Sequence, residues 1–290
     1  MKKILVTGAW WMLASDFLQY ASGNFEIIWL TKEELDITDI HMVEKKIKEI
    51  QPDCILNCAA YTQVDAAEST WKDLCYAINS IWVGNLATIT AQEGIDFITL
   101  STDYVFEGTQ TIEWYTEKDV CNPLNEYGKS KYEGECRARQ ENPDTIIIRT
   151  SWLYGGWRDN KNFVNTMLSL AEKKNEIMVV NDQFWCPTNC VDLVKALVMV
   201  IENIEKYRGN ILHFTNTTPA QWVSWYDFAQ KIFSLTKKDI SVIPVSSDEY
   251  PTTTKRPKNS RLINTSDISL RDWEEGLEEY ISQYYNNYTP

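Results

Sequence analysis

The sequence predicts an α/β fold built on a doubly wound parallel sheet, followed by a smaller C-terminal lobe. Short apolar, β-branched runs alternate with longer amphipathic segments over the first half of the chain. This alternation is typical of buried parallel strands joined by helical crossovers. After Thr150 the alternation loosens. We therefore expect one domain over residues 1–150 and a second lobe over residues 151–290, part of which returns to the main sheet.

The expected strands of the first domain are short apolar runs: Lys3–Thr7, Ile27–Leu30, Cys54–Asn57, Phe97–Ser101 and Thr145–Arg149. The expected helices have apolar residues at helical spacing, at Leu13–Ser22, Ile40–Ile50, Lys72–Gln92 and Glu126–Gln140. In the second lobe we expect helices at Phe163–Lys173, Val191–Glu205 and Ser224–Leu235, strands at Ile177–Val180 and Ile240–Ile243, and a loop at Pro251–Pro257. Right-handed crossovers then give a doubly wound sheet.

Composition excludes several classes of protein. The formal net charge is −13 over 290 residues with no basic block, which argues against a nucleic-acid or anionic-membrane surface. The seven cysteines are irregularly spaced, and neither Cys54/Cys58 nor Cys186/Cys190 has the companion ligands of a zinc site, so we expect neither disulfides nor a metal. No apolar run is long enough to cross a bilayer, and Asp16 interrupts the only stretch that resembles a signal peptide. We therefore expect a cytoplasmic protein.

The segment after the first strand lies where a dinucleotide-binding fold turns from strand to helix and presents backbone N–H groups to a pyrophosphate. It reads Thr7-Gly8-Ala9-Trp10-Trp11-Met12-Leu13-Ala14. Gly8 is the only glycine in this loop, so the loop alone is a weak signal. The second strand ends without an acidic residue to hold two ribose hydroxyls, and Lys32 could offset a phosphate charge. This favours NADPH slightly over NADH.

Tyr127 and Lys131 are four residues apart in a predicted helix and therefore share one face of it. The lysine ammonium can lower the pKa of the phenol and also hold a cofactor ribose, so that the phenol exchanges a proton with a substrate oxygen near neutral pH. Thr102, at the end of an apolar strand, adds a hydroxyl group. The alternative is an ordinary surface pair. The flanking Asn125 and Gly128 and the upstream Ser-Thr-Asp-Tyr segment argue against it.

Many blocks of the sequence resemble the dTDP-4-dehydrorhamnose reductases, a nucleotide-sugar branch of the extended short-chain dehydrogenase/reductase family. They run nearly end to end: Leu35–Thr38, Asn57–Thr62, Val64–Asp65, Ala67–Glu68, Ser101–Phe106, Asn122–Glu135, Arg149–Gly155, Asn162–Val164, Asp182–Gln183, Pro187–Thr188, Ser224–Ala229 and Arg256–Pro257. The resemblance implies a Rossmann-like domain over residues 1–150 that binds NADPH or NADH, and a lobe over residues 151–290 that mainly binds a dTDP-sugar. It implies reduction of the 4-keto group of dTDP-4-dehydro-L-rhamnose, and it leaves a homodimer open.

The resemblance also implies roles for single residues. Tyr127 donates the proton, Lys131 holds the nicotinamide ribose and Thr102 completes the catalytic triad. The implied cofactor-binding residues are Gly8, Trp11, Met12, Leu13, Asp36, Ile37, Ala59, Ala60, Tyr61, Tyr127 and Lys131. The implied substrate-binding residues are Thr102, Asp103, Trp152, Asn162 and Arg256. Simpler roles stay open: Trp152 as core filling, Asp103 as a loop brace and Arg256 as the partner of an acidic surface residue.

Two other functions stay open. One is another nucleotide-sugar reductase or epimerase of the same family. The other is a non-catalytic dinucleotide-binding regulatory subunit, like that of a methionine adenosyltransferase, although the retention of Thr102, Tyr127 and Lys131 argues against it. The acidic pair Glu133/Glu135 is expected on a solvated helix face.

The sequence departs from the family pattern mainly in its tryptophans, since it has 12 Trp and only 11 Gly, whereas glycine is normally among the commonest residues. Four tryptophans fall where the family favours glycine: Trp11, Trp82, Trp157 and Trp185. Five more stand where glycine would be unsurprising: Trp10, Trp29, Trp71, Trp114 and Trp222. We hypothesise that the source reads UGA as glycine and that these letters are misread. The rival hypothesis is that the indoles are genuine, in which case Trp11 obstructs the pyrophosphate.

Overall fold

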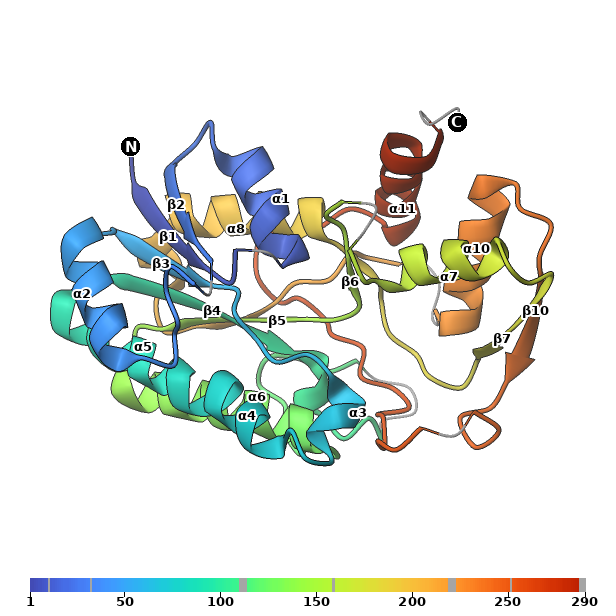
Figure 1. Ribbon diagram of the computed structural model, residues 1–290, viewed down its shortest axis with the longest axis horizontal. Helices are drawn as coiled ribbons and strands as arrows, with labels where there is room; N and C mark the ends of the chain where they lie inside the picture. The colour runs from blue at the N-terminus through green and yellow to red at the C-terminus, as the bar shows by residue number, and fades with distance from the viewer. Residues whose placement is uncertain are drawn as a thin grey trace.

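A six-stranded parallel sheet in the order β2-β1-β3-β4-β5-β9 forms the centre of the protein (Figure 1). Its strands are β1 (Lys3–Thr7), β2 (Glu26–Leu30), β3 (Cys54–Asn57), β4 (Asp96–Thr102), β5 (Ile146–Thr150) and β9 (Ile211–His213). The computed structural model describes residues 1–9, 11–31, 33–109, 114–157, 160–218, 223–250 and 252–286. The predicted α/β fold with a doubly wound parallel sheet is confirmed, and all five strands expected in the first domain are present.

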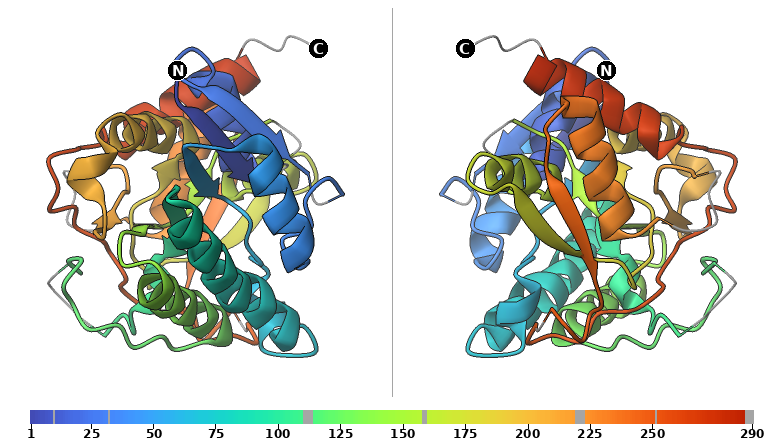
Figure 2. Two further views of the ribbon diagram at one scale, coloured as in Figure 1. Left: turned by 90° about the vertical axis from the view of Figure 1, so that its left-hand side faces the viewer. Right: turned by 90° about the vertical axis from the view of Figure 1, so that its right-hand side faces the viewer.

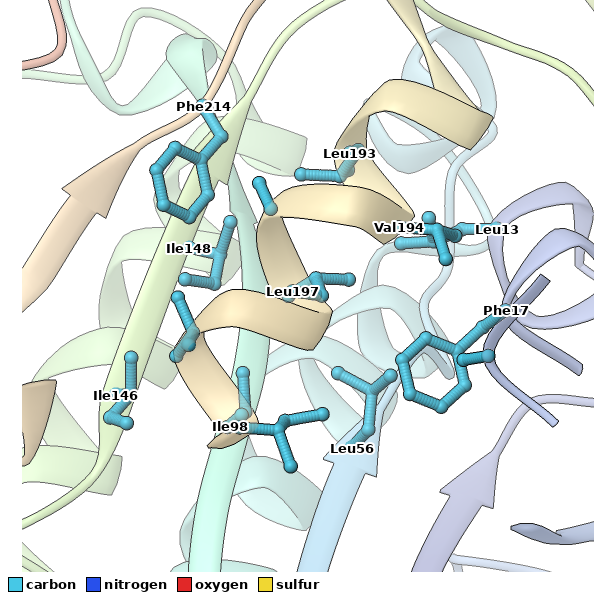
Figure 3. Packing of buried hydrophobic residues seen from close by; sticks show 14 of the residues in the cluster. Leu13, Phe17, Leu56, Ile98, Ile146, Ile148, Leu193, Val194, Leu197 and Phe214 are labelled. Atoms are coloured by element: carbon cyan, nitrogen blue, oxygen red, sulfur yellow. The ribbon is translucent and has the colours of Figure 1, made fainter. Parts of the chain in front are cut away.

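Helices cover both faces of the sheet, as the two views of Figure 2 show. On one face lie α1 (Met12–Ala21) and α8 (Cys190–Glu202), and on the other lie α2 (Ile40–Ile50), α5 (Trp82–Glu93) and α6 (Glu126–Glu141). The first interface packs Phe17 of α1 and Leu197 of α8 against strand residues such as Leu56 and Ile148 (Figure 3). Burial of these apolar side chains holds the layers together.

Three elements from the second half of the chain complete the sheet domain. The helix expected at residues 191–205 is α8, which ends at Glu202 because Asn203 has a non-helical backbone and donates through Nδ2 to the Met199 carbonyl at 2.9 Å. A short helix, α9 (Ile204–Tyr207), follows. The sequence did not predict β9, which pairs with β5 through Ile147 and Ile211. Its three residues are too few to show a strand pattern.

The single helix expected at residues 72–92 contains a π-helical turn. It consists of α4 (Lys72–Tyr76), the π turn η1 (Ala77–Ile81) and α5. Asn79 in this turn accepts a hydrogen bond from the Tyr61 backbone N–H at 2.9 Å and donates to the Tyr61 carbonyl at 3.0 Å. A Cβ at Gly134 of α6 would collide with the Asn79 carbonyl, so α6 packs directly on the turn. These tertiary contacts explain why local periodicity missed the irregularity.

The second lobe lies at the right of Figure 1 and has its own apolar core. Its elements are α7 (Phe163–Ala171), β7 (Glu176–Val180), α10 (Trp225–Thr236), β10 (Ser241–Val245), α11 (Trp273–Ile281) and the π turn η3 (Ser282–Asn286). Strands β7 and β10 pair in parallel. The helices and strands expected here are confirmed, whereas α11 was not predicted. The division of the chain near residue 150 stays a prediction.

The remaining short elements lie at the carboxyl ends of the main strands or between the two cores. They are α3 (Val64–Ala67), the 3₁₀ turn η2 (Asp103–Val105), β6 (Leu153–Tyr154) and β8 (Thr188–Asn189). Residues 252–257 contain neither helix nor strand, and Pro251 of the expected loop lies outside the described residues. None of the helices in the described part is both long and apolar enough to cross a membrane.

Candidate active site

A cavity of about 350 Å³ lies at the carboxyl ends of the central strands, where ligands bind in open α/β sheets. Its lining contains most of the residues that the sequence predicted for catalysis and for the nicotinamide end of the cofactor: Trp11, Met12, Leu13, Ala60, Thr102, Asp103, Tyr127, Lys131 and Trp152. Lys161 also lines it and was not predicted. Residues distant in sequence are therefore brought together around Tyr127.

The start of α6 positions Tyr127. Asn125 caps this helix by accepting a hydrogen bond from the Gly128 N–H at 2.8 Å. A Cβ at Gly128 would collide with the carbonyl of Tyr104, so the first turn of α6 can pack directly against η2 only with glycine there. The ring of Tyr104 then meets that of Tyr127 edge to face, with 5.8 Å between their centroids. These contacts fix the direction of the phenol.

The pKa of Tyr127 lies above its ordinary value because the phenol is removed from water. A hydrogen bond with Thr102 opposes this shift, and the negative charge of Asp103 adds to it. The expectation that Lys131 lowers the pKa of the phenol is therefore wrong for this structure. Burial penalises the phenolate and is the largest influence.

Lys131 is buried beside the strand that ends in Thr102. Its Nζ donates to the carbonyl oxygen of Leu100 at 2.5 Å. Burial lowers the pKa of Lys131 to about 8, while the nearby carboxylate of Glu135 opposes this shift. The ammonium therefore lies close enough to its titration range to be sensitive to its surroundings near neutral pH.

Glu135 does not lie on a solvated face, as the sequence led us to expect. It is almost fully buried and forms an ion pair of 2.6 Å with Arg149 of β5. It also accepts a hydrogen bond from the Ser101 hydroxyl. Lys131 and Glu135, four residues apart on α6, thus bond to consecutive residues of β4. Glu133 is exposed and pairs with Arg137 at 2.7 Å, so the expectation holds for that residue.

Asp103 is a buried carboxylate with three hydrogen-bond donors around it. The Ser260 hydroxyl donates at 2.5 Å, the Thr102 hydroxyl at 3.0 Å, and the Trp185 indole N–H also donates. Burial raises the pKa of Asp103 to about 7, although these donors oppose the shift. Sequence analysis did not identify Ser260 or the role of Trp185, because both come from distant loops.

Trp152 lies in a stack of aromatic rings at the edge of the cavity. Its ring is nearly parallel to that of Trp225, with centroids 3.0 Å apart and an angle of 9°. Trp185 lies against it with a centroid distance of 4.3 Å. The backbone of Trp152 has a positive φ of 46°, which is uncommon for a large side chain. This conformation turns the chain between β5 and β6.

The turn after β1 contains one position that only glycine can occupy. Gly8 has φ +75°, and a Cβ there would lie 2.7 Å from the Ala59 nitrogen, so only glycine fits. Trp11 is the N-cap of α1 and has an extended backbone that any L-residue can adopt. Its indole is 41% exposed and lines both the catalytic cavity and a neighbouring hollow beside Tyr61 and Trp71. The turn therefore keeps the glycine that a dinucleotide-binding loop requires after its first strand, while the indole of Trp11 lines the adjoining cavity.

The predicted adenine-site residues lie after β2. Asp36 accepts hydrogen bonds from the Thr38 N–H at 2.8 Å and from its hydroxyl at 2.6 Å, which shapes this loop. Ile37 is buried beside it. Lys32, which supported the preference for NADPH, lies outside the described residues.

Two of the predicted substrate residues do not line the catalytic cavity. Asn162 caps α7 by accepting from the Asn165 N–H at 2.9 Å, and it donates to the Gly155 carbonyl at 3.3 Å. Arg256 forms an ion pair of 2.7 Å with Asp65 and lines a second, larger cavity of about 990 Å³. The described residues contain no cluster of His, Cys, Asp and Glu that could hold a metal ion.

Comparisons with known proteins agree with this geometry. The RmlD substrate binding domain family matches residues 1–286. Spore coat polysaccharide biosynthesis protein SpsK of Bacillus subtilis is 38% identical over 98% of both chains. The dTDP-4-dehydrorhamnose reductase of Sinorhizobium fredii is 36% identical over 96% of both.

Solved structures give the same result. A dTDP-4-dehydrorhamnose reductase from Clostridium acetobutylicum is 42% identical, with a TM-score of 0.90 over 97% of this chain and 99% of that one. The enzyme of that name from Bacillus anthracis, in complex with NADP, is 37% identical, with a TM-score of 0.90 and the same coverage. The chain belongs to the RmlD substrate binding domain family, in which it is similar to dTDP-4-dehydrorhamnose reductases, as its sequence blocks predicted.

Proposed function

We propose that the protein reduces the 4-keto group of dTDP-4-dehydro-L-rhamnose to the hydroxyl of dTDP-L-rhamnose, with NADPH as the cofactor. The observation that carries this proposal is the convergence of Thr102, Tyr127 and Lys131 on one cavity at the strand ends. The names of the relatives, and the NADP complex of one of them, support the choice of substrate and cofactor.

Tyr127 is assigned as the proton donor. The raised pKa keeps the phenol protonated at neutral pH. An alkoxide that forms on the ketone oxygen is a stronger base than a phenolate, so the proton transfer remains favourable. Thr102, which shares a hydrogen bond with the phenol, orients that proton.

The cofactor would be held by the backbone of the Gly8 turn, by the N-terminus of α1 and by Lys131. When bound, its reduced nicotinamide supplies the hydride. Lys131 is already fixed by its bond to the Leu100 carbonyl, so little conformational freedom is lost when the ribose is bound. Asp103, held by three donors, lines the same cavity as Tyr127, where a sugar ring would contact it.

The proposal is tested by incubating the purified protein with NADPH and dTDP-4-dehydro-L-rhamnose. We expect NADPH oxidation and formation of dTDP-L-rhamnose, identified by mass spectrometry. A panel of other nucleotide-linked keto sugars tests the specificity. Turnover of another sugar with none of this one would reassign the substrate, and no NADPH oxidation with any of them would contradict the reductase function. The molar mass in solution tests the homodimer that the resemblance leaves open.

A further inference from the structure

Two cavities lie in the region where the sequence predicted substrate-binding residues. The inner cavity surrounds Tyr127 and has about 350 Å³. The outer cavity has about 990 Å³, and its lining includes Phe184, Arg256 and Asn259. Ligand sites typically have roughly 300–1,000 Å³. The inner cavity would hold the nicotinamide and a sugar ring, so the nucleoside diphosphate attached to that sugar needs a second space.

Trp185 belongs to a segment that contacts residues of both cavities, and we call this segment the wall between them. Its side chain is fully buried and its indole N–H donates to the carboxylate of Asp103. Its ring centroid is 4.3 Å from that of Trp152. Asp103 and Trp152 both line the inner cavity, whereas Phe184, the residue before Trp185, lines the outer one. The indole thus stands where the two spaces would meet.

A second segment completes the wall. The Ser260 hydroxyl donates to the same oxygen of Asp103 at 2.5 Å, and the preceding residue, Asn259, lines the outer cavity. The backbone N–H of Ser260 donates to the Phe184 carbonyl at 3.4 Å. This bond holds the two segments side by side, and Asp103 is fixed by both.

Aromatic rings lie behind Trp185. Trp152 is already in contact with Trp225, at a centroid distance of 3.0 Å, and Phe163 lies 4.4 Å beyond it. Carbon atoms have their optimal separation at roughly 3.5–4.0 Å. The rings behind Trp185 are therefore closely packed, and Trp185 can move toward Trp152 only if Trp152 and Trp225 move as well.

We infer that Trp185 closes the passage between the inner and the outer cavity and thereby restricts the carbonyl substrates that can reach Tyr127. This inference rests on the proposed function. A glycine at position 185 would remove the indole and join the two cavities beside Asp103. The sugar could then lie at Tyr127 while the diphosphate extends toward Arg256, whose planar guanidinium suits phosphate oxygens. Where position 185 is tryptophan, it is thus a specificity-determining residue and not a catalytic one; where the codon is read as glycine, the two cavities are joined.

The test measures two properties of a Trp185→Gly variant. The first is the Kd for dTDP-L-rhamnose, which would span both cavities, by isothermal titration calorimetry, a measurement that does not depend on turnover; the Kd for dTDP alone, which needs only the outer cavity, is the control. The second is the KM for dTDP-4-dehydro-L-rhamnose in NADPH oxidation. We expect both constants to fall at least about tenfold, the range that pocket contacts produce. Trp185→Phe keeps an aromatic plug, and Trp157→Gly removes an indole that is 60% exposed, so both controls should behave like the unmodified protein.

Each outcome decides something different. If dTDP-L-rhamnose binds Trp185→Gly no more tightly than the unmodified protein, the inference is wrong, whether or not the enzyme turns over. If binding of dTDP-L-rhamnose improves but no variant oxidises NADPH, the inference stands and the proposed function fails. If Trp185→Gly has no cooperative melting transition, it is not folded, and the same Kd and KM measurements are made on Trp185→Leu. Leucine keeps apolar packing but is smaller than the indole, so the same outcomes decide.

Discussion

Glu135 of α6 and Arg149 of β5 form an ion pair of 2.6 Å between two side chains that are almost completely buried. Glu135 also accepts from Ser101, and Lys131 on the same helix face donates to Leu100. The pair therefore fixes α6 to the strand that ends in Thr102. This contact holds the helix that presents Tyr127 in register with the sheet.

Replacing Glu135 with Gln should destabilise the protein by about 3–5 kcal/mol, because it leaves the Arg149 charge buried without its partner. Urea unfolding measures this change. The matched control is Glu133→Gln, which breaks an exposed pair and should cost less than about 1 kcal/mol. Equal effects of the two substitutions would show that the buried pair is not what holds α6.

Asp103 should make the stability depend on pH. Its folded-state pKa of about 7 lies above the ordinary value of 3.8. The stabilisation that comes from this raised pKa is therefore fully present below pH 3.8, where the carboxyl is protonated in both states, and is lost as the pH rises through about 7. Burial also raises the pKa of Asp16, to about 6, and this acts in the same direction.

The difference between the unmodified protein and Asp103→Asn isolates the first of these groups. We expect the free energy of unfolding of the variant to fall less steeply between acidic and neutral pH. Parallel curves for the two proteins would mean that Asp103 titrates in the folded protein as it does in water.

Trp11→Gly should strengthen NADPH binding by about tenfold or more, since an indole no longer lies where the loop backbone approaches the pyrophosphate. The exchange should cost the helix little, because glycine is tolerated at an N-cap. A fluorescence titration with NADPH measures the affinity, and Trp29→Gly on β2 is the control for loss of a partly exposed indole. Tight binding by the unmodified protein would show that the indole swings clear of the cofactor.

The intact mass of protein from its natural source tests the tryptophan hypothesis. Trp10 and Trp222 lie outside the described residues. Among the other seven suspect positions, Trp11, Trp29, Trp71 and Trp157 are exposed, which is unusual for so large an apolar side chain. None of the seven has a positive φ, so the backbone does not require glycine there. We expect a mass lower than that of a chain with 12 tryptophans, and a mass that matches all of them would end the recoding hypothesis.

Local patterns predicted most of the fold. Strands β1 and β3 agree residue for residue with the expected runs, because apolar β-branched sequences bounded by polar residues are distinctive. Contacts between distant segments caused the errors. The π turn depends on Asn79 meeting Tyr61, and the burial of Glu135 depends on Arg149 in the next strand.

For the candidate site, the sequence predicted the residues that lie on neighbouring elements and missed those that come from distant loops. Thr102 ends β4, and Tyr127 and Lys131 lie on α6, the next α-helix in the chain. The order of these elements therefore predicted that the three residues would lie close together. Trp185 and Ser260 come from loops far along the chain, and only the fold brings them to Asp103. The direction of the pKa shift of Tyr127 also required the structure, because burial outweighed the effects that sequence spacing predicts.

The assignment of Tyr127 as proton donor to a ketone is tested most directly by comparing the unmodified protein with Tyr127→Phe. The assay uses NADPH deuterated at its transferable position and dTDP-4-dehydro-L-rhamnose. The unmodified protein should form dTDP-L-rhamnose with deuterium at the sugar C4. The variant should retain NADPH binding but lose roughly 10²–10⁴-fold in rate, as expected for loss of a general acid. Product without deuterium at C4, or full activity in the variant, would contradict the account.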